Sequence, residues 1–355
     1  MILVNNPGDW GKTFAPLLHA DWHGWTATDL VFPFFLFVMG VAIPLALSNR
    51  LERSGGATAE IHRQIFRRTL ILLALGLLLN WVPFFGVDWS KVRIPGVLQR
   101  IAVVYFLASL AYLHLKMRGR AWLTVGLLSG YWLALMLVPV PGFGAGDLSP
   151  QGNLAGYVDG VVLGPHAWVD APGPGDPEGI LSTFPALATA LIGLLAGELL
   201  RSPRRSQEKL RGLLIAACAC ISGGLLMANW FPINKNLWTS SYVVFTAGIA
   251  LALLGGIYHL VDIKGRDRWA KPFLVFGMNS IAAFVGSGLL ARVLLKTRWE
   301  SADGSTVSLH RWLYEICVVP LLPDYWASLA WAIANVILWL VLMGLLYQRR
   351  ILIKI

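Results

Sequence analysis

Residues 29–48 read DLVFPFFLFVMGVAIPLALS, a stretch that carries no charge after Asp29. A membrane-spanning helix needs about 20 mostly apolar residues, and this stretch supplies them. Eight further stretches share this character, with approximate bounds 66–84, 97–115, 121–138, 183–200, 211–229, 239–260, 272–291 and 326–347. We therefore expect an all-α polytopic transmembrane helical bundle with about nine complete spans, forming a single domain over residues 1–355.

The composition agrees with a membrane protein. Of the 355 residues, 56% are hydrophobic and only 14% are charged, whereas a soluble protein carries about 25% charged residues. The formal net charge is +10, but basic residues in a polytopic protein mostly report which loops face the cytoplasm. The composition therefore indicates a protein embedded in a lipid bilayer, and we expect no nucleic-acid partner.

The basic residues alternate along the connections between spans. Most of the 29 Lys and Arg residues follow the first, third, fifth, seventh and ninth spans. The positive-inside rule assigns these connections to the cytoplasm, so we expect the N-terminus outside and the C-terminus in the cytoplasm. The opening residues Met1–Asn5 read like the last turn of a helix, and we interpret them as the remnant of a missing first helix.

The longest connection, residues about 139–182, belongs to the outer face. It contains Asp and Glu but no Lys or Arg, and it is rich in Gly and Pro. Such residues specify turns rather than helices, and a connection of this length is usually functional or disordered. We therefore expect turns rather than helices in this connection. Its aromatic residues favour an ordered lid over a disordered segment.

Polar residues gather at four outer helix ends, and we expect them to converge on one outward-facing cavity. The four clusters contain Asn5, Asn6, Asp9, His19, Asp21, His23 and Asp29; Gln99 and Arg100; Asp176 and Glu178; and Asn234, Lys235 and Asn236. Ionisable residues at the edge of a membrane are costly to keep and indicate function by default.

Each candidate also has a structural interpretation. His19 is either a general base or a histidine whose hydrogen bonds are simply satisfied. Asp29 either orients His19 or caps the helix that follows. No motif of paired ligands supports a metal site, so we expect none.

The other clusters leave similar alternatives. Arg100 lies inside an apolar helix and needs a partner, for which Asp29 and Glu178 are the candidates, in a structural ion pair or a substrate contact. Asn234 and Lys235 belong either to the site or to an ordinary helix cap at the membrane interface.

Several strings in this chain resemble the heparan-α-glucosaminide N-acetyltransferase family of membrane enzymes and its bacterial relatives. The strings occupy residues 3–5, 19–22, 29–33, 91–100, 176–181, 234–238 and 277–280. They run through nearly the whole chain, and the decapeptide 91–100 is particularly specific. The family has a further helix before residues 3–5, and its absence here indicates a start assigned too late or a truncated chain.

The resemblance implies an enzyme that takes acetyl from cytoplasmic acetyl-CoA and delivers it to the amine of a glucosamine-type sugar at the outer face. The active-site histidine of the family matches His19, and a required asparagine matches Asn5. The resemblance also implies a homodimer, and we expect the bacterial inner membrane as its location. It does not indicate which residues bind acetyl-CoA.

We expect a direct transfer in which His19 removes the proton of the attacking amine, because an amine attacks a thioester only when neutral. Asn5 would donate to the oxyanion, and Asp29 or Asp21 would orient His19. Asp176 and Glu178 would bind the sugar. In the alternative mechanism, His19 accepts the acetyl group first and then passes it on.

Two other functions remain open. An O-acyltransferase of an envelope glycan would keep the donor and change the acceptor. A small-solute transporter would also show polar residues within spans, but it should display repeat symmetry and broken helices near the midplane, which the sequence does not show.

Overall fold

The computed structural model describes residues 1–82, 88–300 and 304–353. Eight helices in this part of the chain are long and apolar enough to cross a membrane. They are α2 (Val31–Ser54), α3 (Ala59–Trp81), α4 (Val97–His114), α5 (Met117–Leu137), α7 (Thr183–Arg201), α8 (Ser206–Met227), α9 (Ser240–Tyr258) and α13 (Asp324–Gln348). They coincide with eight of the nine expected spans and confirm an all-α polytopic architecture. The expected end of the second span, at 84, lies outside the described residues.

The remaining expected span, 272–291, is not one straight helix. It consists of α10 (Lys271–Met278) and α11 (Ser280–Lys296), and the two segments are bent by 68°. The break falls at Asn279, whose side-chain amide donates to Ile351 O at 3.1 Å and whose Oδ1 accepts from Ile353 N at 2.8 Å. These bonds tie the break to the residues that follow α13.

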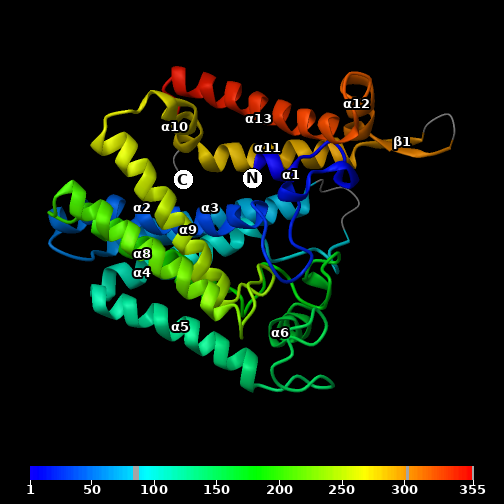
Figure 1. Cartoon of the computed structure of the whole chain (residues 1–355). Helices are drawn as coiled ribbons and strands as arrows, with labels where there is room; N and C mark the ends of the chain where they lie inside the picture. Colours follow the sequence, from blue (N-terminus) through cyan, green and yellow to red (C-terminus); the bar gives the residue numbers. More distant parts are fainter. Residues whose placement is uncertain (83–87, 301–303, 354–355) are drawn as a thin grey trace.

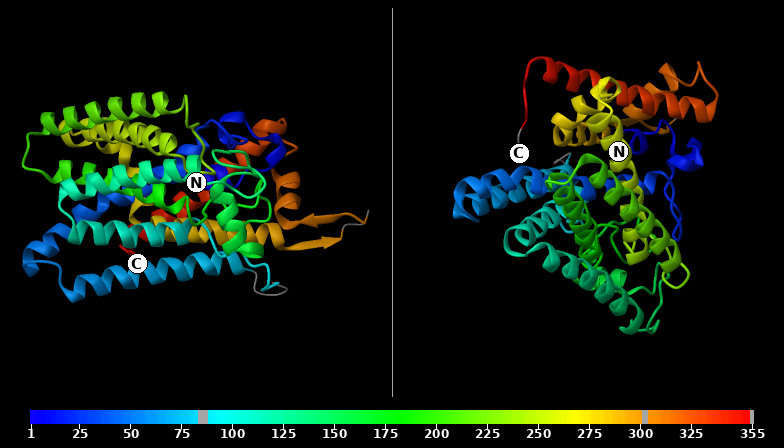
Figure 2. Two further views of the ribbon diagram at one scale, coloured as in Figure 1. Left: turned by 90° about the horizontal axis from the view of Figure 1, so that it is seen from below. Right: turned by 60° about the vertical axis from the view of Figure 1, so that its left-hand side comes forward.

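The connections sort onto two ends of the bundle. Figure 1 shows α1 (Ile2–Asn5), α6 (Leu154–Val162), α12 (Leu309–Cys317) and the β1 strand (Arg298–Glu300) gathered at its right-hand end. The turns from α2 to α3 and from α7 to α8 lie at the opposite end, and the views in Figure 2 agree. This alternation matches the predicted division into outer and cytoplasmic connections.

Glycines set the closest helix contacts in the bundle. A Cβ at Gly40 of α2 would lie 2.0 Å from Ala190 O, and a Cβ at Gly193 of α7 would lie 2.0 Å from Phe37 O. Only glycine allows backbones to approach this closely. The α2–α7 pair therefore forms the tightly packed centre of the bundle, with Leu36 buried within it.

The outer end contains more regular structure than the sequence indicates. The long loop was expected to lack helices, but it contains α6 and the 3₁₀ turn η4 (Gly164–His166). Asn153 caps α6 by accepting a hydrogen bond from Gly156 N, as an N-cap asparagine does. The antiparallel pair of β1 and β2 (Thr306–Ser308) and helix α12 were not anticipated.

The remaining short elements are 3₁₀ or π turns. The N-terminal segment contains η1 (Trp10–Lys12) and η2 (Ala15–Leu17), and η3 (Thr28–Leu30) leads directly into α2. A π turn, η5 (His259–Ile263), extends α9, and η6 (Arg268–Ala270) precedes α10. The segment between η2 and η3 has no regular structure and carries His19.

Candidate active site

His19 is held by the carboxylate of Asp29, at the start of the first membrane-spanning helix. The His19 Nδ1 atom lies 2.6 Å from Asp29 Oδ1. The Asp29 side chain is buried, with 1% of its surface exposed, whereas half of the His19 side chain is exposed. The buried carboxylate therefore fixes a histidine whose side chain remains half exposed.

Asp29 accepts several hydrogen bonds at once. Its Oδ2 atom accepts from Ala20 N at 3.0 Å, from Thr26 N at 3.0 Å and from Thr26 Oγ1 at 3.2 Å. A carboxyl group that only accepts is ionised. The proton between the two groups then belongs to His19 Nδ1, which donates to the carboxylate. Asp29 does not cap α2, because the N-cap residue Leu30 has no side-chain bond there.

Lys235 approaches the same histidine from the turn between α8 and α9. Its Nζ atom lies 2.9 Å from His19 Nδ1, 3.2 Å from His19 Nε2 and 3.5 Å from Asp29 Oδ1. The Lys235 side chain is 17% exposed, and burial lowers its pKa even though the charges of Asp29 and Glu178 oppose that shift. The three residues form a carboxylate–imidazole–amine cluster.

The turn that carries Lys235 is stabilised by Asn234. The Asn234 Oδ1 atom accepts from Leu237 N at 2.9 Å, and its Nδ2 atom lies 3.3 Å from His23 Nδ1. Trp238 has a φ of +54°, a left-handed backbone conformation that residues other than glycine rarely adopt. Its side chain is buried, with 1% exposed. The structure thus gives Asn234 the role of fixing this turn.

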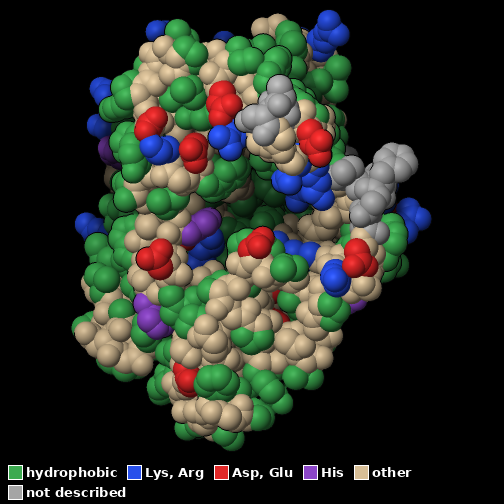
Figure 3. Space-filling model, turned by 90° about the vertical axis from the view of Figure 1, so that its right-hand side faces the viewer, with side chains coloured by type: hydrophobic (Ala, Val, Ile, Leu, Met, Phe, Trp, Pro, Cys, Tyr) green, Lys and Arg blue, Asp and Glu red, His purple; other side chains and the backbone are tan. Residues whose placement is uncertain are grey.

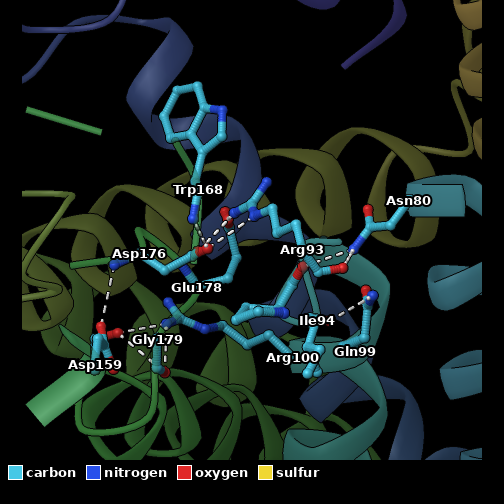
Figure 4. A network of polar contacts seen from close by, with 12 residues as sticks. Asn80, Arg93, Ile94, Gln99, Arg100, Asp159, Trp168, Asp176, Glu178 and Gly179 are labelled. Atoms are coloured by element: carbon cyan, nitrogen blue, oxygen red, sulfur yellow. Dashed lines mark hydrogen bonds and ion pairs between the residues drawn. The ribbon is translucent and has the colours of Figure 1, made fainter. Parts of the chain in front are cut away.

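A second polar cluster joins the residues before α4 to the long outer loop (Figure 4). Arg93 donates to both carboxylate oxygens of Asp176, at 2.8 and 2.6 Å, and to Glu178. Burial alone would lower the pKa of Arg93, but the Asp176 hydrogen bond and the Glu178 charge raise it above its ordinary value. Asp176 also accepts from Trp168 N and Glu178 N. The loop is therefore anchored to the bundle by a forked ion pair.

Arg100 was expected to pair with Asp29 or Glu178, and in the described part of the chain it forms no ion pair. Its Nη2 atom donates to Gly179 O at 3.1 Å and to Ser182 Oγ. The guanidinium also lies over the ring of Trp238, at 5.1 Å. Glu178 pairs with Arg93 instead, because the two groups meet at the outer surface while Arg100 lies deeper, at 2% exposure.

Arg93 and Asp159 are site residues that the sequence reasoning missed. Asp159 of α6 accepts from Asp176 N at 3.1 Å and from Ile180 N at 2.8 Å, and burial raises its pKa above the ordinary value. Arg93 could have been found, because it falls within the specific string 91–100. Asp159 offers no such signal within the long loop.

Asn5 lies apart from the His19 cluster. It is exposed and lines a cavity of about 210 Å³ together with Asn80, Arg93 and Arg292. No hydrogen bond or ion pair joins Asn5 to His19 in the described residues. The two clusters and this cavity share the outer end, where Figure 3 shows a hollow bordered by acidic and basic side chains and by histidine. The four predicted groups therefore reach one end of the bundle, where His19, Asp29 and Lys235 touch one another and Asn234 contacts His23.

A basic cavity occurs at the opposite, predicted cytoplasmic end. It has a volume of about 260 Å³ and is lined by Arg50, Gln64, Arg67, Arg68 and Tyr105, among others. The Arg68 guanidinium lies 4.7 Å from the Tyr105 ring centre, and its buried Nε atom has no hydrogen-bond partner in the part of the chain that the structure describes. Such a surface suits a phosphorylated ligand.

Comparison with known proteins identifies relatives. The human protein named heparan-alpha-glucosaminide N-acetyltransferase is 31% identical over an alignment that covers all of this chain and 58% of the human protein. The mouse protein of the same name is 33% identical over 87% of this chain and 54% of its own length. This chain is thus a relative of the heparan-alpha-glucosaminide N-acetyltransferases. It spans little more than half the length of these relatives. A family described as a domain of unknown function, DUF5009, matches residues 10–152.

These alignments confirm the resemblance to the N-acetyltransferases that the sequence strings of this chain indicated. The match to DUF5009 includes His19, Asp29, Arg93 and Arg100, and the alignments to the N-acetyltransferases extend over most of the chain. The DUF5009 match therefore covers His19 and Asp29 but ends before Lys235.

Proposed function

We propose that this protein is a membrane N-acetyltransferase that moves acetyl from cytoplasmic acetyl-CoA to the amine of a glucosamine-type sugar at the outer face. The observation that carries the proposal is the Asp29–His19 pair, in which Nδ1 lies 2.6 Å from the carboxylate and the other ring nitrogen, Nε2, does not contact it. This is the arrangement of a general base and its orienting group. The names of the relatives support acetyl transfer to a glucosamine amine.

In the proposed reaction, His19 takes the proton from the acceptor nitrogen as that nitrogen attacks the thioester carbonyl. Asp29 holds the ring and stabilises the imidazolium that results. His19 then gives the proton to the departing thiolate. The amide of Asn5 would reach the oxyanion only if the cavity that it lines opens toward His19, so its role stays a prediction.

Acetyl-CoA supplies the activated thioester, and the cytoplasmic cavity fits its phosphates. Arg50, Arg67 and Arg68 present guanidinium groups that hydrogen-bond phosphate well, and the unpartnered Nε of Arg68 provides a donor there. We propose that these residues hold the nucleotide end of the donor.

The outer loop would confine the acceptor. Glu178 is near enough to Lys235 for its charge to act there, and we propose that it binds the sugar. Asp176 is fully buried against Arg93, so we propose that it positions Glu178 and the loop. We further propose a homodimer in the bacterial inner membrane.

The deciding experiment is thiol release from acetyl-CoA by the purified protein in detergent, with and without glucosamine. We expect glucosamine-dependent release that is lost in His19→Ala. Release without dependence on any amino sugar would favour an O-acyltransferase. Solute flux in vesicles without consumption of acetyl-CoA would reject the enzyme in favour of a transporter.

A further inference from the structure

The amine of Lys235 lies against the ring of the proposed base, in the space next to it that an acceptor amine must enter. A general base must lie within about 2.6–3.2 Å of the atom that it deprotonates. Lys235 Nζ lies 2.9 Å from His19 Nδ1 and 3.2 Å from His19 Nε2, so the amine packs beside the ring, and a rotation of the flexible lysine side chain is needed to bring it into line with Nε2. A thioester placed to react with an acceptor amine at His19 would therefore also lie close to Lys235 Nζ.

We propose that Lys235 is a site of self-acetylation, at which this enzyme modifies itself when acetyl-CoA is present and no sugar acceptor is bound. The inference rests on the proposed acetyl transfer. The Nζ lone pair forms a bond to the thioester carbonyl carbon, and the carbon–sulfur bond breaks. The proton from Nζ passes to His19 Nε2 and then to the thiolate, giving Nε-acetyl-Lys235 and free CoA.

The surroundings of Lys235 favour this reaction over ordinary lysine chemistry. Most of its side chain is buried, and burial lowers its pKa, so a larger fraction of the amine is neutral near pH 7 than for an exposed lysine. The charged groups that face it are Asp29 at 3.5 Å and Glu178, together with the His19 ring. The charges of Asp29 and Glu178 favour the protonated form of Lys235 and therefore slow its acetylation. A bound sugar would displace the Lys235 amine from His19.

An acetylated Lys235 would change the site. The amide has no positive charge and no basic lone pair, so its attraction to Asp29 is lost and its bulk fills the space beside His19. The enzyme would become inactive in proportion to the ratio of donor to acceptor. The modification would therefore keep the enzyme inactive after a period without acceptor, and it needs no second binding site.

The test uses the full chain in detergent, incubated with isotopically labelled acetyl-CoA and no sugar, followed by mass spectrometry of peptides. We expect label on Lys235 that resists hydroxylamine, with Lys12 and Lys91 labelled much more slowly because no histidine base lies beside them in the described structure. His19→Ala should slow labelling of Lys235 by about 100-fold or more, and glucosamine should protect it. Lys235→Arg should remove the labelled peptide.

Two results would count against the inference, and they are distinguishable. If the same preparation acetylates glucosamine while Lys235 stays unlabelled, or if the label is found only as a hydroxylamine-sensitive adduct on His19, self-acetylation of Lys235 is wrong and the proposed function stands. If neither glucosamine nor Lys235 receives acetyl, the proposed function fails with it.

Discussion

At the scale of single residues, Asp29 decides which nitrogen of His19 is free. All four of its donors, on His19, Ala20 and Thr26, come from the segment between η2 and η3, so the carboxylate shapes this segment as well as holding the ring. The sequence places His19 and Asp29 close enough to suggest this pair. It cannot show the contact with Lys235, which lies 216 positions away and depends on how α8 and α9 pack.

Asp29→Asn should reduce kcat/KM for acetyl transfer by about 10²–10⁴-fold, because an amide can bond the ring in the wrong tautomer. The comparison is with Asp21→Asn, since Asp21 is exposed and makes no described contact with His19. Equal losses in both variants would contradict the role of Asp29 as the orienting residue.

The rate of self-acetylation at Lys235 should rise with pH and then level off. The lowered pKa of Lys235 means that its neutral form grows as pH rises and levels off at a lower pH than for a lysine with the ordinary pKa. Labelling rates measured across the alkaline range should therefore level off earlier for Lys235 than for Lys12, whose pKa the Asp324 contact raises. A later plateau for Lys235 would contradict the effect of burial.

Asp176→Asn should lower the free energy of unfolding by about 1–3 kcal/mol, because it removes one of the two counter-charges of the largely buried Arg93 and leaves Glu178. The expected change is a lower midpoint of thermal unfolding in detergent. Asp170→Asn, an exposed change in the same loop, should have little effect. An unchanged midpoint for Asp176→Asn would show that the loop is anchored by other contacts.

At the scale of elements, the closest approach of two helices depends on glycine. Gly40→Ala places a Cβ against Ala190 O, and we expect it to destabilise the α2–α7 pair by about 1–3 kcal/mol. Gly130→Ala in α5 meets nothing within 4 Å, so it should be neutral or stabilise by up to about 1 kcal/mol through helix propensity. Thermal unfolding of the two variants checks both expectations, and similar midpoints would contradict them.

The break in the α10–α11 span is an element-scale feature that periodicity could not reveal. The stretch 272–291 is apolar apart from Asn279, Ser280 and Ser287, and the groups that satisfy Asn279 lie far along the chain, at Ile351 and Ile353. Asn279→Ala should leave Ile353 N without its acceptor. Hydrogen exchange at that amide should become faster than in the wild type, while amides in the middle of α13 keep their protection.

At the scale of the whole molecule, charge patterning predicted the alternation of the helices well. Hydropathy is a local property and located eight helices, whereas the contents of the outer end depend on contacts between distant segments. This is why α6, α12 and the β1–β2 pair were missed and why Arg100 was assigned the wrong partners.

The sidedness of the molecule can be tested directly. In a background without Cys218, Cys220 and Cys317, Asp170→Cys should react with an impermeant maleimide added outside intact cells. Arg204→Cys should react only after the membrane is opened. The reverse pattern would place the His19 cluster in the cytoplasm.

Helix α2 connects the two proposed ligand sites mechanically. Asp29 lies at its outer start and Arg50 near its inner end, about 30 Å apart at 1.5 Å per residue. Pro44 removes one backbone hydrogen bond between them and provides a point of bending. A movement of the Arg50 end that is not absorbed by bending at Pro44 is expected to displace the carboxylate that holds His19. By thermodynamic linkage, the occupants of the two sites alter each other's affinity by the same factor.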